Sequence, residues 1–364
     1  MSDNGIILLA LCYTLYTRAM YDKDLKAKLE HFLADKEHIV IVQGDNPDAD
    51  SLASSLALEE LLYTQNINST MYCSIDVAQY LRYLEGWDRV TNQLPGIFDA
   101  WILVDCEYLR LLDNVDSAGH LSMLRGKPLL VLDHHDSPTD IDFAEVLLND
   151  PTCGATGQVI HNVCKLLGWE ITQRSAEMMV VSILSDTLGF NSEFMNGNSG
   201  PLRTVADLVD AGVKLGELNE RRVKQFQISP DIFRYKSELM QRVEFHYDNR
   251  IATLDIPHDE IKEYSMDYNP TVVLDETRNI AGLAITIGLK SYERNGRIYR
   301  ITGRIRCGFG YRFARDLAQH FKDGGGHPYA AGFKIVGDDL NLAEIKNDAI
   351  QKAYELLLEV DTQK

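Results

Sequence analysis

Four short segments place carboxylate and imidazole side chains where apolar runs end. Asp48 and Asp50 follow the apolar run at 38–42, and Asp105 follows the run at 101–104. The other two segments are Asp133-His134-His135-Asp136, after the run at 128–132, and Ser185-Asp186-Thr187, after the run at 176–184. Carboxylates crowded this closely repel one another, and a bound cation is the simplest compensation.

Each aspartate segment taken alone also has an ordinary structural explanation. Asp50 or Ser51 could cap a helix, and single aspartates such as Asp105 and Asp186 are common in turns and caps. Two adjacent histidines between two aspartates are harder to explain in this way. Carboxylate and imidazole ligands without thiolates favour manganese or a similar ion. Four such termini together match the needs of a two-metal site, which can clamp a phosphoryl group for in-line attack.

The elements that must position these residues follow a regular alternation. Strands are predicted at 38–42, 69–74, 100–104 and 128–132, and helices at 51–63, 154–168 and 174–185. Strands that alternate with helices indicate an α/β fold with a parallel sheet. Such sheets bind ligands at the carboxyl ends of their strands, which is where the polar segments lie.

The pattern of the sequence changes after residue 217. We predict a catalytic, metal-binding domain at 1–217, a linker helix within 218–245, and a smaller mixed α/β substrate-binding domain at 246–364. Ser229-Pro230 starts the linker helix, and alternating strands such as 250–256 and 298–305 follow it. The length of 364 residues also favours two domains over one.

The second domain contains a basic segment in an acidic chain. Residues 290–322 carry nine basic and two acidic side chains, a net +7; since the whole chain is −18, the remainder is −25. Arg304 and Arg306 alternate on a predicted strand and should share a face. Tyr292, Tyr299, Phe309 and Tyr311 lie among the basic residues and could stack on bases. Such a local patch is what an acidic protein needs to bind a nucleotide.

Together these segments resemble the DHH phosphoesterase superfamily. Asn46-Pro47-Asp48-x-Asp50, Asp105, Asp133-His134-His135 and Asp186-Thr187 appear in the family's order and rough spacing. Near the C-terminus, Gly324-Gly325-Gly326-His327-Pro328 and Ala330-Ala331-Gly332-Phe333 are similar to the signature of its associated substrate-binding domain. The resemblance covers about residues 38–335 and includes the nanoRNA and pAp phosphatases, the cyclic-dinucleotide phosphodiesterases and the RecJ-like exonucleases.

The resemblance implies a role for each matching residue. Asp48 would ligate the first metal and Asp50 the second, Asp105 would bridge the two, and His134 and Asp186 would complete the second site. His135 would act on the scissile phosphate or the leaving oxygen, and Asp133 would fix a histidine. Substrate would be bound by Arg304, Arg306, Gly325, Gly326 and His327, with the glycines leaving backbone N–H groups open to phosphate.

One position departs from the family pattern. The family usually has a histidine four residues before the first aspartate of Asp-x-Asp, and here that residue is Gly44. The first metal could be held more weakly, Asp45 or water could replace the ligand, or the protein could be a noncatalytic nucleotide sensor. Asp48-Ala49-Asp50-Ser51 and Ser185-Asp186-Thr187-Leu188 also resemble the manganese-dependent inorganic pyrophosphatases, which is the other alternative.

The expected protein is a cytoplasmic, manganese-dependent hydrolase. Two Mn²⁺ ions are expected, with Mg²⁺ or Co²⁺ as alternatives, and the expected substrates are short RNA, dinucleotides and pAp. Long duplex nucleic acid and membranes are not expected partners, and a homodimer is left open.

The six scattered cysteines form no zinc pattern, which suggests a reducing compartment. The apolar run at 6–15 is too short to span a bilayer, lacks a signal-peptide pattern, and is predicted to be a buried helix.

Overall fold

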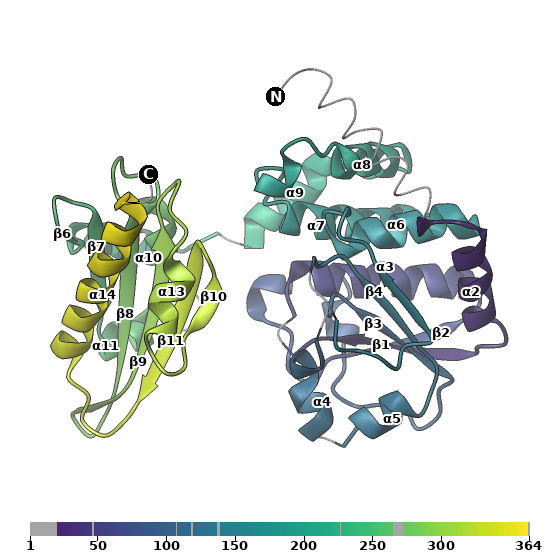
Figure 1. Cartoon of the computed structure of the whole chain (residues 1–364), viewed down its shortest axis with the longest axis horizontal. Helices are drawn as coiled ribbons and strands as arrows, with labels where there is room; N and C mark the ends of the chain where they lie inside the picture. The colour runs from purple at the N-terminus through teal and green to yellow at the C-terminus, as the bar shows by residue number, and fades with distance from the viewer. Residues whose placement is uncertain are drawn as a thin grey trace. The chain divides into compact units, whose positions relative to one another are not determined.

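The computed structural model describes residues 20–45, 47–106, 108–117, 119–136, 139–225, 227–264 and 273–362. The helix predicted at 6–15 lies outside these residues. The chain divides into two compact units, Met1–Phe226 and Gln227–Lys364 (Figure 1). The predicted linker 218–245 spans the end of α9 (Leu215–Gln225) and α10 (Pro230–Gln241). Tyr235 and Leu239 of α10 are buried within the second unit.

The first unit is built on a five-stranded parallel sheet of order β2-β1-β3-β4-β5. Its strands are β1 (His38–Gln43), β2 (Asn68–Tyr72), β3 (Ala100–Val104), β4 (Leu129–Asp133) and β5 (Val146–Asn149). The predicted α/β fold class is therefore confirmed. β5 was not among the predicted strands, because its four residues are fewer than in an ordinary strand.

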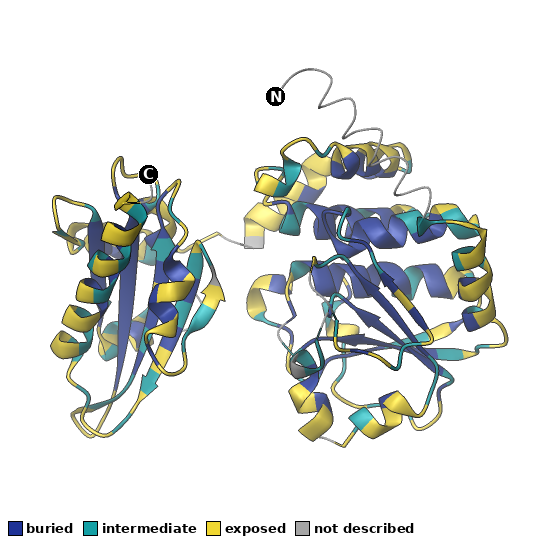
Figure 2. Ribbon diagram, viewed as in Figure 1, coloured by how far each residue is buried: buried dark blue, intermediate teal, exposed yellow. Residues whose placement is uncertain are grey.

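Helices cover both faces of this sheet, which explains why β3 and β4 are buried along their whole length (Figure 2). On one face, α3 (Ala49–Thr64), α6 (Thr156–Leu167) and α7 (Gln173–Asp186) enclose the larger core. On the other face, α4 (Asp113–Ser117) and α5 (Leu121–Arg125) enclose a smaller one. The remaining elements of the unit are α2 (Lys23–Leu33), η1 (Gln79–Leu81), η2 (Trp87–Arg89), η3 (Leu109–Leu112), η4 (Glu193–Met195), α8 (Gly200–Asp210) and α9.

The start of α3 differs from the expected one. The helix begins at Ala49, and its N-cap is Asp48, whose Oδ1 accepts hydrogen bonds from the backbone N–H groups of Asp50 and Ser51. The cap expected from the sequence was Asp50 or Ser51. Because Asp48 takes that task, Asp50 lies inside the first turn and its side chain is directed into the protein.

The second unit contains a six-stranded mixed sheet of order β10-β11-β9-β8-β7-β6, in which β7 and β8 are parallel. Its strands are β6 (Glu244–His246), β7 (Ile251–Ile256), β8 (Ile285–Arg294), β9 (Arg297–Cys307), β10 (Gly325–His327) and β11 (Ala330–Val336). One core lies against α13 (Ala314–Gln319) and α14 (Leu342–Thr362). Another lies against α10, α11 (His258–Glu263) and α12 (Leu274–Thr277).

None of the helices in the described ranges is long and apolar enough to cross a membrane. The five described cysteines, at 73, 106, 153, 164 and 307, are buried free thiols.

Candidate active site

The predicted site residues of the first unit meet at the carboxyl edge of its sheet. β1 has β2 on one side and β3 on the other, so the strand order reverses there, and such switch points are where open α/β sheets bind ligands. Asp50 follows β1, Asp105 follows β3, and His134 follows β4. Asp186 ends α7, which packs against α3.

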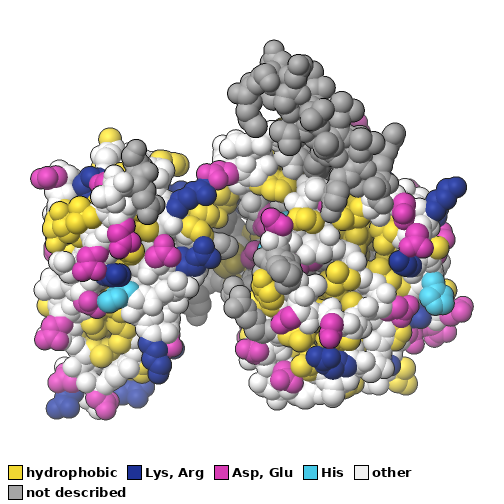
Figure 3. Space-filling model, in the orientation of Figure 1, with side chains coloured by type: hydrophobic (Ala, Val, Ile, Leu, Met, Phe, Trp, Pro, Cys, Tyr) yellow, Lys and Arg dark blue, Asp and Glu magenta, His cyan; other side chains and the backbone are white. Residues whose placement is uncertain are grey.

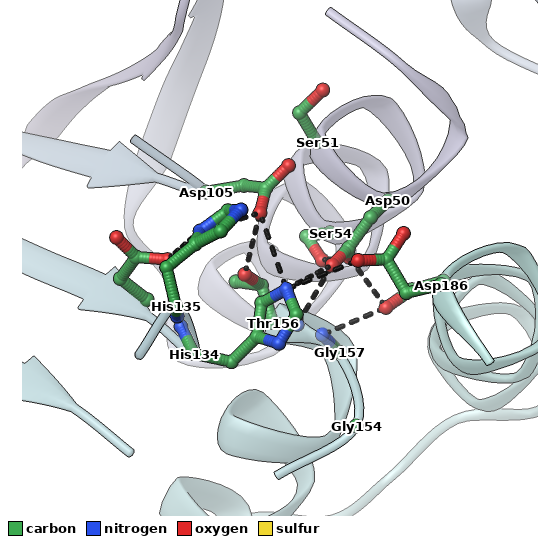
Figure 4. A network of polar contacts seen from close by, with 12 residues as sticks. Asp50, Ser51, Ser54, Asp105, His134, His135, Gly154, Thr156, Gly157 and Asp186 are labelled. Atoms are coloured by element: carbon green, nitrogen blue, oxygen red, sulfur yellow. Dashed lines mark hydrogen bonds and ion pairs between the residues drawn. The ribbon is translucent and has the colours of Figure 1, made fainter. Parts of the chain in front are cut away.

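Asp50 is fully buried and is held by three hydrogen bonds (Figure 4). Its Oδ1 accepts from the hydroxyl groups of Ser54 at 2.9 Å and Ser182 at 2.6 Å. Its Oδ2 accepts from the backbone N–H of Thr156 at 2.9 Å. A buried carboxylate without such donors would be strongly disfavoured, so these three groups hold Asp50 in one orientation.

Asp105 is held in a strained backbone conformation. Its φ of 54° lies in the left-handed region, which residues other than glycine adopt only when their surroundings impose it. Its backbone N–H is bonded to the carbonyl of Leu132 at 3.0 Å, which fastens the end of β3 to β4. Its Oδ1 accepts from the hydroxyl group of Thr156 at 3.2 Å.

His134 lies at the centre of these carboxylates (Figure 4). Its Nε2 is 3.1 Å from Asp186, 3.4 Å from Asp50 and 3.7 Å from Asp105. Two groups of possible ligand atoms converge here, Asp50–His134–Asp186 and Asp105–His134–His135. Nε2 is buried and has no hydrogen-bond partner of normal geometry in the described part of the chain. A buried imidazole nitrogen surrounded by carboxylate oxygens offers the ligand atoms that suit a divalent cation.

The electrostatics of the cluster show what a cation would relieve. Burial, and then the charges of Asp50 and Asp48, raise the pKa of Asp105 well above its usual value. Burial and the charge of Asp50 raise the pKa of Asp186 to about 6. Burial opposes protonation of His134, but its contact with Asp186 and the neighbouring carboxylates outweigh burial and raise its pKa to about 9. In the absence of a cation, protons therefore take up part of the negative charge.

Asp133 is arranged to orient both histidines. Its Oδ1 accepts from the backbone N–H groups of His134 at 2.7 Å and His135 at 3.3 Å, and it lies 2.7 Å from Nδ1 of His135. Asn149 adds a hydrogen bond from its side-chain amide to the carbonyl of His135, at 3.0 Å. The side chain of His135 is 39% exposed, so a substrate can reach it.

Asp48 and Gly44 belong to the first metal position that the family resemblance implies. Among the described residues, Asp48 is in neither group of convergent ligand atoms. Burial and the charge of Asp50 raise the pKa of Asp48. A Cβ atom built on Gly44 would lie no closer than 3.6 Å to its nearest neighbours, Leu111 and Cys106, and its φ is not positive.

Asp45, considered as a replacement ligand, is already engaged. Its Oδ1 accepts a short hydrogen bond from the hydroxyl group of Ser74, and its Oδ2 accepts from the backbone N–H of Asn114 at 2.7 Å. Both oxygens are therefore used to attach the segment after β1 to Ser74, which follows β2, and to α4.

The predicted substrate residues of the second unit occupy two strands of its sheet, β9 and β10, which are separated by β11. In the sheet register, Arg306 of β9 pairs with Ala330 of β11, and Ala330 pairs with His327 of β10. Two residues along, Arg304 pairs with Gly332, and Gly332 pairs with Gly325. The structure thus places all five predicted positions (Arg304, Arg306, Gly325, Gly326 and His327) on β9 and β10, the strands that flank β11.

The three glycines at 324–326 have different reasons to be glycine. A Cβ on Gly324 would lie 1.7 Å from the carbonyl oxygen of Ala318, so this residue permits close packing on α13. Gly326 has a φ of 135°, and its Cβ would lie 2.7 Å from Ala331. A Cβ on Gly325 would meet nothing within 4 Å. Packing therefore explains Gly324 and Gly326 but not Gly325.

The residues that orient the aspartates were not among the predicted site residues. Thr156, Ser54 and Ser182 are small polar residues within helices, and their types alone do not distinguish them from ordinary helix residues. A Cβ on Gly157 would lie 2.3 Å from Oγ of Ser182. This glycine lets α6 approach α7 closely enough for its N–H to donate to Ser182 at 2.8 Å.

Comparison with known proteins agrees with this arrangement. Residues 38–185 match the model described as the DHH family, N-terminal domain. The first unit contains a DHH-family domain. The matched range runs from the start of β1 to the last residue but one of α7. It contains Asp50, Asp105 and His134, and Asp186 directly follows it.

Similar proteins cover both units of this chain. It is 28% identical over 321 residues, 88% of either chain, to the "bifunctional oligoribonuclease and PAP phosphatase NrnA" of Thermus thermophilus. An exopolyphosphatase-related protein from Bacteroides fragilis has the same fold, with a TM-score of 0.76 and 19% identity over 92% of this chain and 98% of that one. RecJ of Thermus thermophilus in complex with Mn²⁺ has a TM-score of 0.51 and 14% identity, over 91% of this chain and 54% of RecJ.

Proposed function

We propose that this protein is a metal-dependent phosphoesterase that hydrolyses small nucleotides: short oligoribonucleotides, linear or cyclic dinucleotides, or pAp. The observation that carries the proposal is the position of His134 Nε2, within 3.1–3.7 Å of three buried or half-buried carboxylates in a DHH-family domain. The resemblance to a relative named as an oligoribonuclease and PAP phosphatase supports the substrate class.

Two divalent cations would be held at this site, with Mn²⁺ preferred and Mg²⁺ or Co²⁺ as alternatives. Asp50, His134 and Asp186 would hold one. Asp105, whose Oδ1 lies 3.7 Å from Nε2 of His134, would serve both, as the family resemblance implies. When bound, such ions neutralise the charge of a phosphoryl group and lower the pKa of an attacking water. RecJ, which shares this fold, has been crystallised with Mn²⁺ and, separately, with Mg²⁺.

His135 would handle a proton during catalysis. Its Nδ1 lies 2.7 Å from Asp133 Oδ1, so a proton on Nδ1 would be held there, and the other ring nitrogen would remain to act on substrate. The fixed ring orientation and its exposure suit protonation of the leaving oxygen. Asp133 would act through His135 by holding its ring and tautomer.

The second unit would recognise the nucleotide. Arg306 forms an ion pair with Asp275 at 2.9 Å, and its side chain is 20% exposed. The guanidinium of Arg304 extends over Gly332, since a Cβ there would lie 3.0 Å from its Nη1. Gly332 pairs with Gly325 of β10, so the Arg304 guanidinium lies over the residue of β11 that neighbours Gly325. A guanidinium beside accessible backbone N–H groups is a suitable binding site for phosphate.

Short substrates should be preferred over long ones. The net charge of +7 is confined to residues 290–322, while the remainder carries −25. On the face seen in Figure 3, acidic and basic side chains are interspersed over both units and form no continuous basic track. A long strand would therefore meet repulsive surface, which salt screens only beyond about 8–10 Å.

The test is turnover of a substrate panel by metal-free protein supplied with defined ions. The panel holds pAp, a dinucleotide, a cyclic dinucleotide, a 20-nucleotide RNA and pyrophosphate, each with Mn²⁺, Mg²⁺ or Co²⁺. We expect hydrolysis of one or more of the small nucleotides, strongest with Mn²⁺, and a lower kcat/KM for the 20-nucleotide RNA. Turnover of pyrophosphate alone would indicate the pyrophosphatase alternative. Nucleotide binding without turnover would indicate a sensor and refute the proposed catalysis.

A further inference from the structure

The four aromatic residues of the basic segment have different surroundings. Tyr292 is 6% exposed, with the guanidinium of Arg300 lying 3.7 Å from its ring centroid. Tyr299 and Tyr311 are half-buried against neighbouring side chains. Phe309 is 72% exposed. Of the four, Phe309 therefore presents the largest aromatic surface to solvent.

The backbone around Phe309 holds it in this exposed position. A Cβ on Gly308 would lie 2.0 Å from the carbonyl oxygen of Leu283. The backbone N–H of Gly308 donates to the carbonyl of Ala284 at 2.9 Å. Gly310, on the other side, has a φ of 85°. The two glycines thus permit close packing and a tight turn that side chains would obstruct. An exposed ring on a fixed backbone loses little freedom when it binds a ligand.

Arg278 lies behind the ring. Its guanidinium carbon is 5.3 Å from the centroid of Phe309, within the range of a cation–π contact. Its Nε donates to the carbonyl of Cys307 at 3.2 Å, which fixes the guanidinium to the same loop. Because Arg278 covers one face of the ring, the other face accounts for much of the exposed surface.

The loop that carries Phe309 is attached to the segment after the Gly-rich turn. The N–H of Cys307 donates to the carbonyl of Tyr329 at 2.9 Å, and the N–H of Ala314 donates to Pro328 at 2.8 Å. Pro328 directly follows His327, and Arg306 directly precedes Cys307. The exposed ring is therefore connected on both sides to residues proposed to bind phosphate.

We propose that Phe309, backed by Arg278, is a stacking platform for a nucleobase of the substrate. This inference rests on the proposed function for the phosphate contacts and adds a separate contact to the base. Any nucleobase can stack on an aromatic ring, because every base has a π face. The platform would bind purine and pyrimidine nucleotides alike and would distinguish them from sugar phosphates.

The experiment measures binding of AMP and of ribose 5-phosphate to the metal-free full-length protein by calorimetry. The two ligands share a 5′-phosphate and differ by the base. We expect Phe309→Ala to weaken AMP binding by about 5- to 150-fold, the range for loss of one base–aromatic stack. Binding of ribose 5-phosphate should stay within about twofold, and Phe309→Trp should restore the affinity for AMP.

The matched control is Phe233→Ala, which removes another exposed phenylalanine of the same unit, 67% exposed on α10. It should leave both affinities unchanged. The inference is overturned if Phe309→Ala binds AMP normally, if both ligands weaken equally, or if Phe233→Ala has the same effect. If the wild-type protein binds neither ligand, the phosphate contacts proposed for the second unit fail, and the base platform fails with them.

Discussion

Thr156 contacts two of the buried carboxylates at once: its hydroxyl group donates to Asp105 at 3.2 Å while its backbone N–H donates to Asp50 at 2.9 Å. Asp105 and Asp50 belong to the two different groups of convergent ligand atoms. The first turn of α6 therefore sets the orientation of one carboxylate in each group.

Replacement of Thr156 by valine should weaken metal binding without disturbing the fold. Valine keeps the shape and the backbone N–H to Asp50 but removes the hydroxyl donor to Asp105. Loss of a hydrogen bond that orients a ligand commonly lowers metal affinity by about 10- to 100-fold. Thr156→Ser keeps the hydroxyl group and should retain most of the affinity. Calorimetric titration with Mn²⁺ measures this, and equal affinities for the valine variant and wild type would contradict it.

Asp105→Asn should abolish hydrolysis and stabilise the metal-free protein. Asparagine tolerates the φ of 54° better than alanine and removes the negative charge. Burial and repulsion raise the pKa of Asp105, so its charged form is disfavoured in the fold. A gain of about 1 kcal/mol corresponds to roughly 2–4 °C in melting temperature for a unit of this size. Near-normal activity in this variant would refute the two-metal hypothesis.

The stability of the metal-free protein should fall as pH rises. Folding raises the pKa of Asp186 from 3.8 to about 6, so the folded state binds more protons in that interval and stability decreases from pH 4 to pH 6. His134 has a folded pKa of about 9 against 6.5, so its favourable contribution is complete below 6.5 and is lost towards 9. Thermal melts between pH 4 and 9, compared with His134→Gln and Asp186→Asn, test the attribution.

Metal binding at pH 7.5 should release protons. His134 is protonated at this pH in the metal-free protein because its pKa is about 9, and a metal ligand must be deprotonated. Calorimetry in two buffers with different ionisation enthalpies should give different apparent heats. Identical heats would mean that His134 does not bind the metal or is already neutral.

Gly44→His should lower the Mn²⁺ concentration required for activity. The structure leaves room, since a Cβ there would have ordinary contacts at 3.6 Å and no positive φ opposes it. Both oxygens of Asp45 already accept hydrogen bonds, so Asp45 is poorly placed to substitute. An added imidazole ligand should shift the Mn²⁺ midpoint by about tenfold or more. The control is Gly44→Ala, and an unchanged midpoint for both variants would show that another group completes the site.

Gly325→Ala should weaken phosphate binding while the melting temperature stays the same. In the free protein the new methyl group would meet nothing within 4 Å, so the fold should tolerate it. It would, however, stand where a phosphate must approach the backbone N–H groups. An increased KM with unchanged thermal stability supports this role. If KM is unchanged, Gly325 belongs to an ordinary turn.

The sequence by itself determined the fold class and the composition of the candidate site. Long apolar runs that alternate with helical patterns indicate a buried parallel sheet, and carboxylates and histidines that end those runs must meet at one edge. The motif order also indicated the DHH family. These inferences depend on local patterns of two to four residues, which a single sequence records directly.

The tertiary structure alone decided which side chains support the ligands. Thr156 and Ser182 lie 106 and 132 residues from Asp50 in the chain, and no local pattern links them to it. Likewise, Asp48 is the cap of α3, and Phe309 is the exposed ring among four similar aromatics. Such contacts arise from the packing of α6 on α7 and of loops on the second sheet. Packing depends on the whole fold, and is therefore not encoded in the spacing of neighbouring residues.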